Sequence, residues 1–172
     1  MKNWKILLIM LAIFNMASCD MMMLDKMGEK YHISTEDQAY LVTTFGHKIV
    51  AKYVDRIFVR DLAPTIVGTY AVDSDVIFID ENDAPKSIIV YLIAHEMTHA
   101  WQTRVLYEQY TPSDNYTVDT PILGKLNMEQ EAEIVGFHTQ LKKTPIFTNG
   151  RQIIQSSNDV ELYRYMQQYM EF

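Results

Sequence analysis

The sequence predicts a single α+β domain in which a small sheet packs against two long helices. Three observations lead to this prediction. Short segments rich in β-branched and aromatic residues occupy residues 55–79, longer segments with helical spacing follow them, and no repeat or low-complexity linker divides the chain. The part expected to be mature has roughly 150 residues, which suits one domain with its own hydrophobic core.

Residues 1–18 predict a secretory signal peptide. Lys2 and Lys5 precede a short apolar run over residues 6–14, and the small residues Ala17 and Ser18 follow it. The apolar run is too short to span a bilayer comfortably. We therefore expect these residues to direct export and not to form part of the folded domain.

Cys19 follows the signal peptide and is the single cysteine of the chain, so an internal disulfide is excluded. Its position resembles a bacterial lipobox, in which the cysteine becomes the lipidated first residue of the mature protein. The resemblance implies a lipid-anchored protein of the bacterial cell envelope that faces away from the cytoplasm. Residues 19–32 would then be a tether and residues 33–172 the folded domain. An ordinary cleaved signal peptide and an uncleaved anchor are the alternatives.

Seven elements are expected in the domain. Alternation and β-branched residues predict three strands, the last two forming a hairpin, at residues 55–60, 65–72 and 75–79. Helical spacing predicts four helices at residues 35–52, 84–104, 127–142 and 158–172. Ser34 or Thr35 is the expected N-cap of the first helix, and Asp83 with Pro85 is typical of a helix start. Residues 107–125 are rich in turn formers and predict a long loop.

The segment His95-Glu96-Met97-Thr98-His99 carries the most specific chemical signal in the chain. Residues i and i+4 lie one above the other on a helix, so two imidazoles at this spacing can bind one metal ion. Glu96 then lies beside the metal, where it can polarise a bound water. The alternative is a core helix with two hydrogen-bonded histidines. Burying three ionisable groups in this way is costly unless a metal or other partners compensate.

The predicted helix at residues 127–142 is expected to supply the third metal ligand. Asn127 and Gln130 form the pattern of a capping box. One face of the helix then carries small and acidic residues, which suit close approach to the metal helix: Glu129, Ala132, Glu133 and Gly136. We expect Glu129 to bind the metal and Glu133 to hydrogen-bond a ligand histidine from the second shell. Glu133 as the ligand and a solvated acidic face are the alternatives, and Glu131 is expected at the surface.

Together these two segments resemble the gluzincin zinc metallopeptidases, in which His-Glu-x-x-His is followed by a Glu-x-x-x-Asp type of helix. This chain has Glu133 where that pattern more often has Asp. The run from Leu92 to Gln102 also resembles small peptidase domains of bacteria and phages, some of which accompany secretion and toxin systems. The resemblance covers roughly residues 55–140. It implies a minimal zincin-like fold and hydrolysis of a peptide bond.

The expected function is zinc-dependent hydrolysis of a peptide or protein substrate. His95, His99 and Glu129 would hold Zn²⁺, which lowers the pKa of a water in the fourth position. Glu96 would take a proton from this water and pass it to the leaving amine. The edge strand of the hairpin at residues 75–79 is expected to pair with an extended substrate. Four residues are candidates for the oxyanion donor, namely Tyr110, Tyr116, His138 and Tyr163.

The charge of the chain argues against nucleic acid as a partner. The formal net charge is −7, and it becomes −9 without residues 1–18, which contain two lysines and no acidic residue. An acidic protein without a basic patch has no electrostatic reason to bind nucleic acid. The expected partners are a peptide or protein substrate and, through the lipid anchor, a membrane. The rival functions are a non-catalytic zinc-binding envelope lipoprotein acting in binding, exclusion or immunity, and a lipoprotein that binds a partner without metal.

Overall fold

The computed structural model describes residues 28–64, 66–80, 86–109 and 126–143, and a few further positions (84, 119, 147–148, 151–152, 160–161 and 163–164). These residues form an α+β fold, as the sequence predicts. Its long helices are α2 (Thr35–Tyr53), α3 (Ile89–Gln109) and α4 (Met128–Lys143). Residues 1–18 and Cys19 lie outside the described residues, as do Asp83 and Pro85.

Four short strands form a mixed sheet with the order β1-β2-β4-β3. The strands are β1 (Glu29–Lys30), β2 (Ile57–Val59), β3 (Gly68–Ala71) and β4 (Val76–Ile79). β3 and β4 form the predicted antiparallel hairpin, whereas β2 runs parallel to β4 and β1 antiparallel to β2. Every residue of β4 is buried. β4 is an inner strand by the strand order, and β1 and β3 are the two edges of the sheet among the described residues.

Strand β1 lies within residues 19–32, the range expected to be a tether. Lys30 pairs with Phe58 of β2, and the Tyr31 N–H donates to the Ile57 carbonyl at 2.8 Å. Ile33, which follows, is buried in the core. The sheet therefore begins before the expected domain boundary at residue 33.

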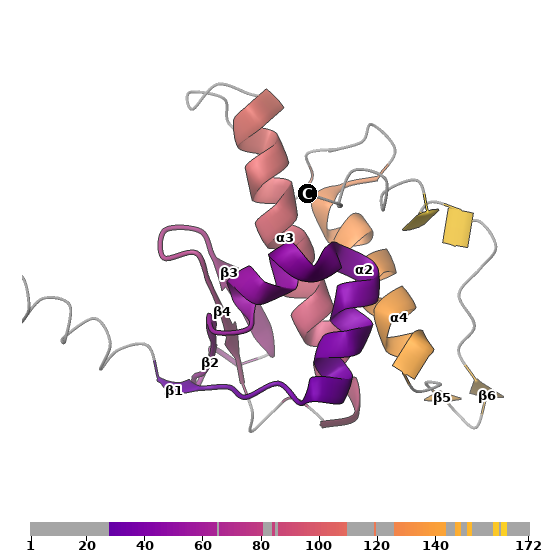
Figure 1. Cartoon of the computed structure of the whole chain (residues 1–172), viewed down its shortest axis with the longest axis horizontal. Helices are drawn as coiled ribbons and strands as arrows, with labels where there is room; N and C mark the ends of the chain where they lie inside the picture. The colour runs from indigo at the N-terminus through magenta and orange to yellow at the C-terminus, as the bar shows by residue number, and fades with distance from the viewer. Residues whose placement is uncertain are drawn as a thin grey trace, which may run out of the picture.

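Helix α3 is the central element and lies between the sheet and α4 (Figure 1). It is apolar around most of its circumference, as expected of a helix covered on several sides. Its buried apolar residues are Ile89, Val90, Leu92, Ile93, Ala94, Met97, Ala100, Trp101 and Leu106. A short 3₁₀ turn, η1 (Lys86–Ile88), leads into α3. Within the described part of the chain, no helix is long and apolar enough to cross a membrane.

After the middle of α3, the structure differs from the expected elements in the end of this helix and in an additional pair of strands. Helix α3 continues to Gln109, so residues 107–109 are helical and the loop expected from residue 107 starts later. Residues 110–118 and 120–125 of that loop lie outside the described residues. A further antiparallel pair, β5 (Phe147–Thr148) and β6 (Arg151–Gln152), was not expected. Residues 160–161 and 163–164 are helical and fall within the helix expected at 158–172.

Helix caps fix the starts of α2 and α4 where the sequence places them. The Asp37 N–H donates to the Ser34 hydroxyl at 3.1 Å, so Ser34 is the cap of α2. The Gln130 N–H donates to Asn127 Oδ1 at 2.9 Å, and the Asn127 N–H donates to Gln130 Oε1 at 3.1 Å. This reciprocal pair confirms the predicted capping box, which orients the first turn of α4 and therefore Glu129.

Helix α4 approaches α3 closely because small residues face it. A Cβ on Gly136 would lie 2.8 Å from the ring of Tyr91 and 3.1 Å from its carbonyl oxygen, so a larger side chain would push the helices apart. Buried Gln140 ties the same helices, since its Oε1 accepts from the Tyr91 N–H and its Nε2 donates to the Ser87 carbonyl. Gln140 thereby holds the start of α3 against α4, whereas Gly136 allows the close approach that brings the acidic face of α4 near the histidines.

Candidate metal centre

His95 and His99 lie one turn apart on α3, with their Nε2 atoms 3.1 Å from each other. Glu129, in the first turn of α4, lies 3.3 Å from His95 Nε2 and 3.5 Å from His99 Nε2. Donors around a tetrahedral zinc are about 3.3 Å apart, given bond lengths of about 2.0–2.1 Å. Among the described residues, these three form the group of metal-ligating side chains whose donor atoms converge, within 4.8 Å of one another. The donor set and its spacing therefore fit a zinc ion.

The surroundings of His99 fix which of its ring nitrogens carries the proton. Gln102 Oε1 lies 2.8 Å from His99 Nδ1, while Gln102 Nε2 donates to the Met128 carbonyl at 2.8 Å and to Glu131 Oε2 at 3.0 Å. Because the amide hydrogens of Gln102 face these two acceptors, its oxygen must face His99 and accept from Nδ1–H. The lone pair of the neutral imidazole is then on Nε2, the atom that faces His95 and Glu129.

The expectation that Glu131 lies at the surface is wrong. Its side chain is buried, with 1% of the residue exposed, and its carboxylate accepts from Gln102. The reason is that α4 packs against both α2 and α3, so more than one of its faces is covered. A buried carboxylate needs such a donor. Gln102 is thus part of the site, and its i+3 spacing from His99 is the sequence signal that indicates the contact.

The Nδ1 atom of His95 is buried and, unlike that of His99, is not held by a hydrogen bond among the described residues. Glu133 Oε2 is 3.8 Å away, beyond hydrogen-bond distance, and accepts instead from the hydroxyl of Tyr91. Glu133 therefore lies outside Glu129 on the His95 side, and it hydrogen-bonds Tyr91 in place of the ligand histidine that was predicted.

Glu96 lines one pocket together with His95, His99 and Glu129, and it is 6% exposed. Gly68 of β3 makes room for it, since a Cβ at that position would lie 3.0 Å from Glu96 Oε1. Burial, followed by the charge of Glu129, raises the pKa of Glu96 to about 8, and a hydrogen bond from the Tyr70 backbone acts in the opposite direction. A carboxyl with a pKa near neutrality can both accept and release a proton, as a general acid–base requires.

The environment of His95 favours the neutral form of its imidazole. Burial, together with the neighbouring His99, lowers the pKa of His95 to about 4, although Glu129 acts to raise it. The imidazole is therefore uncharged at neutral pH and offers a lone pair. Metal binding requires this deprotonated form.

The pocket that contains these groups, called here the metal-centre pocket, has a volume of about 340 Å³. It is bounded by β3, by α3 and by the start of α4, and its lining residues include Gly68, Tyr70, His95, Glu96, His99, Thr103 and Glu129. A cavity of this size is typical of small-molecule or peptide side-chain sites.

The two candidate oxyanion donors that lie among the described residues do not line the metal-centre pocket. These two, His138 and Tyr163, stack on each other with ring centroids 3.5 Å apart. Tyr110 and Tyr116 lie outside the described residues.

Comparison with known proteins adds no family assignment to this geometry. No family model matches the chain, and neither a curated protein nor a solved structure matches it. Function is therefore inferred from the residues of the site and from their arrangement on α3, α4 and β3.

Proposed function

We propose that this protein is a zinc-dependent peptide hydrolase with a zincin-like arrangement of α3, α4 and β3. One observation carries the proposal. His95, His99 and Glu129 converge on one point, and Glu96 faces the same pocket. A purely structural zinc site is usually closed by four protein ligands, whereas three ligands with an open position are typical of catalytic zinc.

The residues of the site have separate roles in metal binding, in proton transfer and in the orientation of His99. A bound Zn²⁺ would supply Lewis acidity, which lowers the pKa of a coordinated water and polarises a carbonyl group. Glu96 accepts a proton from the attacking water and delivers it to the leaving amine. Gln102 and Glu131 hold His99 in the tautomer that presents Nε2.

The edge of β3 is suited to hold an extended substrate. Strand β4 is an inner strand, so the role expected of the hairpin edge falls to β3. The Asp80 N–H donates to the Val67 carbonyl at 3.0 Å, which directs the backbone of Val67 toward β4. By the antiparallel alternation, the backbone groups of Gly68 and Tyr70 point to the outer edge, beside Glu96. A peptide that pairs there would place its backbone next to the metal ligands.

We also propose that the hydrolase is held at the bacterial cell envelope through lipidated Cys19. The support comes from the sequence of residues 1–19 alone. Stable anchoring by acyl chains needs more than one chain, which a lipoprotein N-terminus carries. Labelled fatty acid should enter the wild type and not Cys19→Ser. Absence of label in the wild type would remove the anchor and leave the hydrolase proposal intact.

Cleavage of a mixed-sequence peptide pool by the zinc-loaded full chain tests the activity. New peptide termini, detected by mass spectrometry, should appear with the wild type. Glu96→Gln should retain zinc and lower kcat/KM by about 10²–10⁴-fold, because an amide does not accept the proton. Glu36→Gln is the matched control, since Glu36 is an exposed glutamate of α2 that lines neither the metal-centre pocket nor its neighbours. No cleavage by the wild type, or Glu96→Gln within about tenfold of it, would contradict the proposal.

A further inference from the structure

A second cavity adjoins the metal-centre pocket on the side of the C-terminal half of α3. Its volume is about 560 Å³, and it is bounded by that half of α3, by the end of α2 and by the β3–β4 turn. Tyr70, Val72 and Thr103 line both cavities. The two cavities are therefore neighbours, and a chain that lies along β3 beside Glu96 passes from one to the other.

The spacing between the two cavities matches a short stretch of peptide. Thr103 lies one turn beyond His99, which is about 6 Å along the axis of α3. Val72 lies four residues beyond Gly68, which is about 13 Å in an extended strand. An extended peptide covers these distances in about two to four residues. The second cavity would thus meet a side chain close to the bond that lies beside Glu96.

The second cavity is lined by buried apolar and aromatic residues and, nearer the solvent, by charged ones. Four of its lining residues are buried and apolar or aromatic, namely Ile49, Tyr53, Ala100 and Trp101. Val72 and Tyr107 also line it and are 47% and 54% exposed. They are two of the three large apolar side chains exposed in the described part of the chain, and the third, Ile66, lines neither cavity. Both side chains are therefore accessible to an apolar group that enters the cavity.

Four of the five charged residues of this cavity pair with one another, and the fifth, Asp73, is exposed in the β3–β4 turn. Lys52 pairs with Asp75 at 2.8 Å, and Arg104 pairs with Glu108 at 3.1 Å. Asp75 also accepts from the hydroxyls of Tyr53 and Tyr70. A charged ligand would have to displace these contacts. An uncharged apolar group would leave them in place, so the lining favours an apolar ligand.

We propose that this second cavity is the specificity pocket of the hydrolase, and that it takes one large apolar or aromatic side chain, such as Phe or Leu. The side chain would come from a peptide residue within about three positions of the cleaved bond. The assignment rests on the proposed function for the position of that bond. Binding of the side chain itself can be measured without cleavage.

Trp101 provides the binding measurement, because it lines the cavity and the chain has two tryptophans. In the full chain with Trp4→Phe and Glu96→Gln, Trp101 is the sole tryptophan and cleavage is suppressed. The probe is a capped alanine hexapeptide with one central Phe, compared with the same peptide carrying Ala or Glu there. The Phe peptide should change Trp101 fluorescence saturably and bind at least about tenfold more tightly than the others, as expected for filling an apolar pocket.

Substitutions of Val72 and Tyr107, the two exposed apolar residues that line the second cavity, test where the peptide binds. Val72→Arg and Tyr107→Ala should each remove the preference for the Phe peptide. Ile66→Arg is the matched control and should keep it, because Ile66 is an exposed apolar residue outside both cavities. Equal binding of the Phe and Ala peptides, or equal effects of Val72→Arg and Ile66→Arg, would overturn the assignment.

Cleavage of the peptide pool by the wild type separates this inference from the proposed function. The expected result is one position within three residues of the cut that is enriched in large apolar side chains, and Val72→Arg should remove this enrichment. Cleavage without any such enrichment overturns the specificity pocket and leaves the hydrolase. Selective binding of the Phe peptide without any cleavage supports the pocket and overturns the hydrolase.

Discussion

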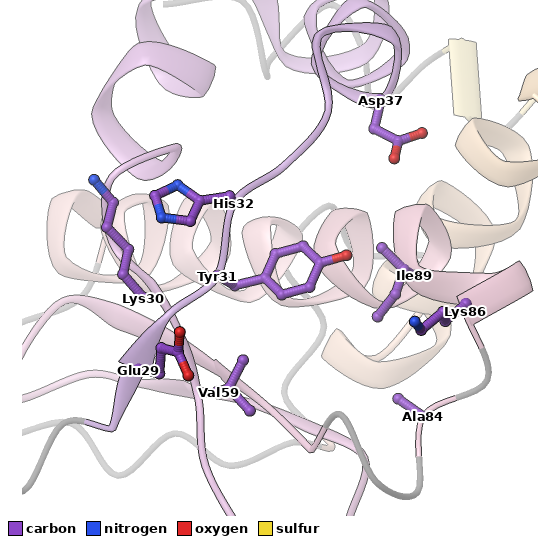
Figure 2. Close-up of a pocket in the computed structure, with 9 residues that line it drawn as sticks. All are labelled: Glu29, Lys30, Tyr31, His32, Asp37, Val59, Ala84, Lys86 and Ile89. Carbon is purple, nitrogen blue, oxygen red and sulfur yellow. The ribbon is translucent and has the colours of Figure 1, made fainter.

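In the described part of the chain, two of the cavities contain histidine and carboxylate side chains, and one of the two has the geometry of a metal site. In the metal-centre pocket, three donor atoms meet from two helices. The other cavity, of about 460 Å³, is lined by residues of β1, the start of α2 and the start of α3 and shares no lining residue with it. Figure 2 shows His32 and Asp37 on different parts of the chain there, with Tyr31 pointing toward Ile89.

Both cavities contain residue types that can bind a metal, but the two differ in whether the donor atoms of these residues meet at one point. His32 is exposed, and Asp37 is an ion-pair partner of Lys143. His95 and His99 instead have the one-turn spacing of a helix, and Gly136 allows α4 to bring its acidic face near them. A site of this kind therefore depends on helix register and on close helix packing, which the predictions below test.

The largest effect is expected from the carboxylate that meets both imidazoles. Glu129→Gln should weaken zinc binding by more than about 100-fold, because it removes a charged ligand and even outer-shell changes cost about 10–100-fold. Glu133→Gln should weaken it by about tenfold or less, since Glu133 lies 3.8 Å from His95 Nδ1 and bonds Tyr91. Competition with a zinc-binding dye measures both. The reverse order of effects would make Glu133 the ligand.

Gln102→Ala should give the next largest effect. Zinc affinity should fall by about 10–100-fold, because His99 loses the acceptor that fixes its tautomer. The free energy of unfolding should fall by about 1–3 kcal/mol, because Glu131 loses its donor.

Gln140→Ala is the matched control for that change. Gln140 is also a buried glutamine that links α3 to α4, but at the other end of the helices from Gln102. It should lower stability by a similar amount and leave zinc affinity unchanged. Equal losses of zinc affinity in the two variants would show that helix packing in general, and not the contact to His99, controls the site.

The smallest effect is expected at Asp75, which holds the β3–β4 turn. Partial burial raises the pKa of Asp75, but hydrogen bonds from Lys52, Tyr53 and Tyr70 lower it more, so the folded-state pKa lies below the usual value. Its ionised form therefore stabilises the fold above about pH 4, and this contribution is lost as the pH falls through the lowered pKa.

Asp75→Asn should lower the free energy of unfolding by about 1 kcal/mol at neutral pH, a figure reduced for partial exposure. Asn also tolerates the positive φ of 53° at this position, so the change isolates the charge. Urea unfolding at several pH values measures it. A difference from wild type that stays constant down to pH 3 would show that the charge of Asp75 is not the cause.

Local signals of the sequence predict much of this fold. The Ser34 cap, the Asn127–Gln130 capping box and the β3–β4 hairpin each depend on residues close in the chain, and each is present. The parallel pairing of β2 with β4 depends on partners far apart in the chain, for which the sequence gives no local signal. The β5–β6 pair was missed despite Asn149-Gly150, a dipeptide typical of hairpin turns.

The candidate site shows the same division. The one-turn spacing of the histidines is local, and it predicts their facing Nε2 atoms. The burial of Glu131 and its link to Gln102 depend on how α4 lies against α2 and α3, which helical periodicity alone does not specify. Residues that orient ligands from a second helix are for this reason the part of a metal site that a single sequence predicts least well.

Zinc content of the purified full chain tests the central claim most directly. Elemental analysis of the wild type should give close to one zinc per chain, and His95→Ala with His99→Ala should abolish it, because Glu129 alone does not hold the ion. His32→Ala, which changes the exposed histidine of the other cavity, should retain the full content. A wild type without zinc, or zinc unaffected by the double replacement, would contradict the metal centre.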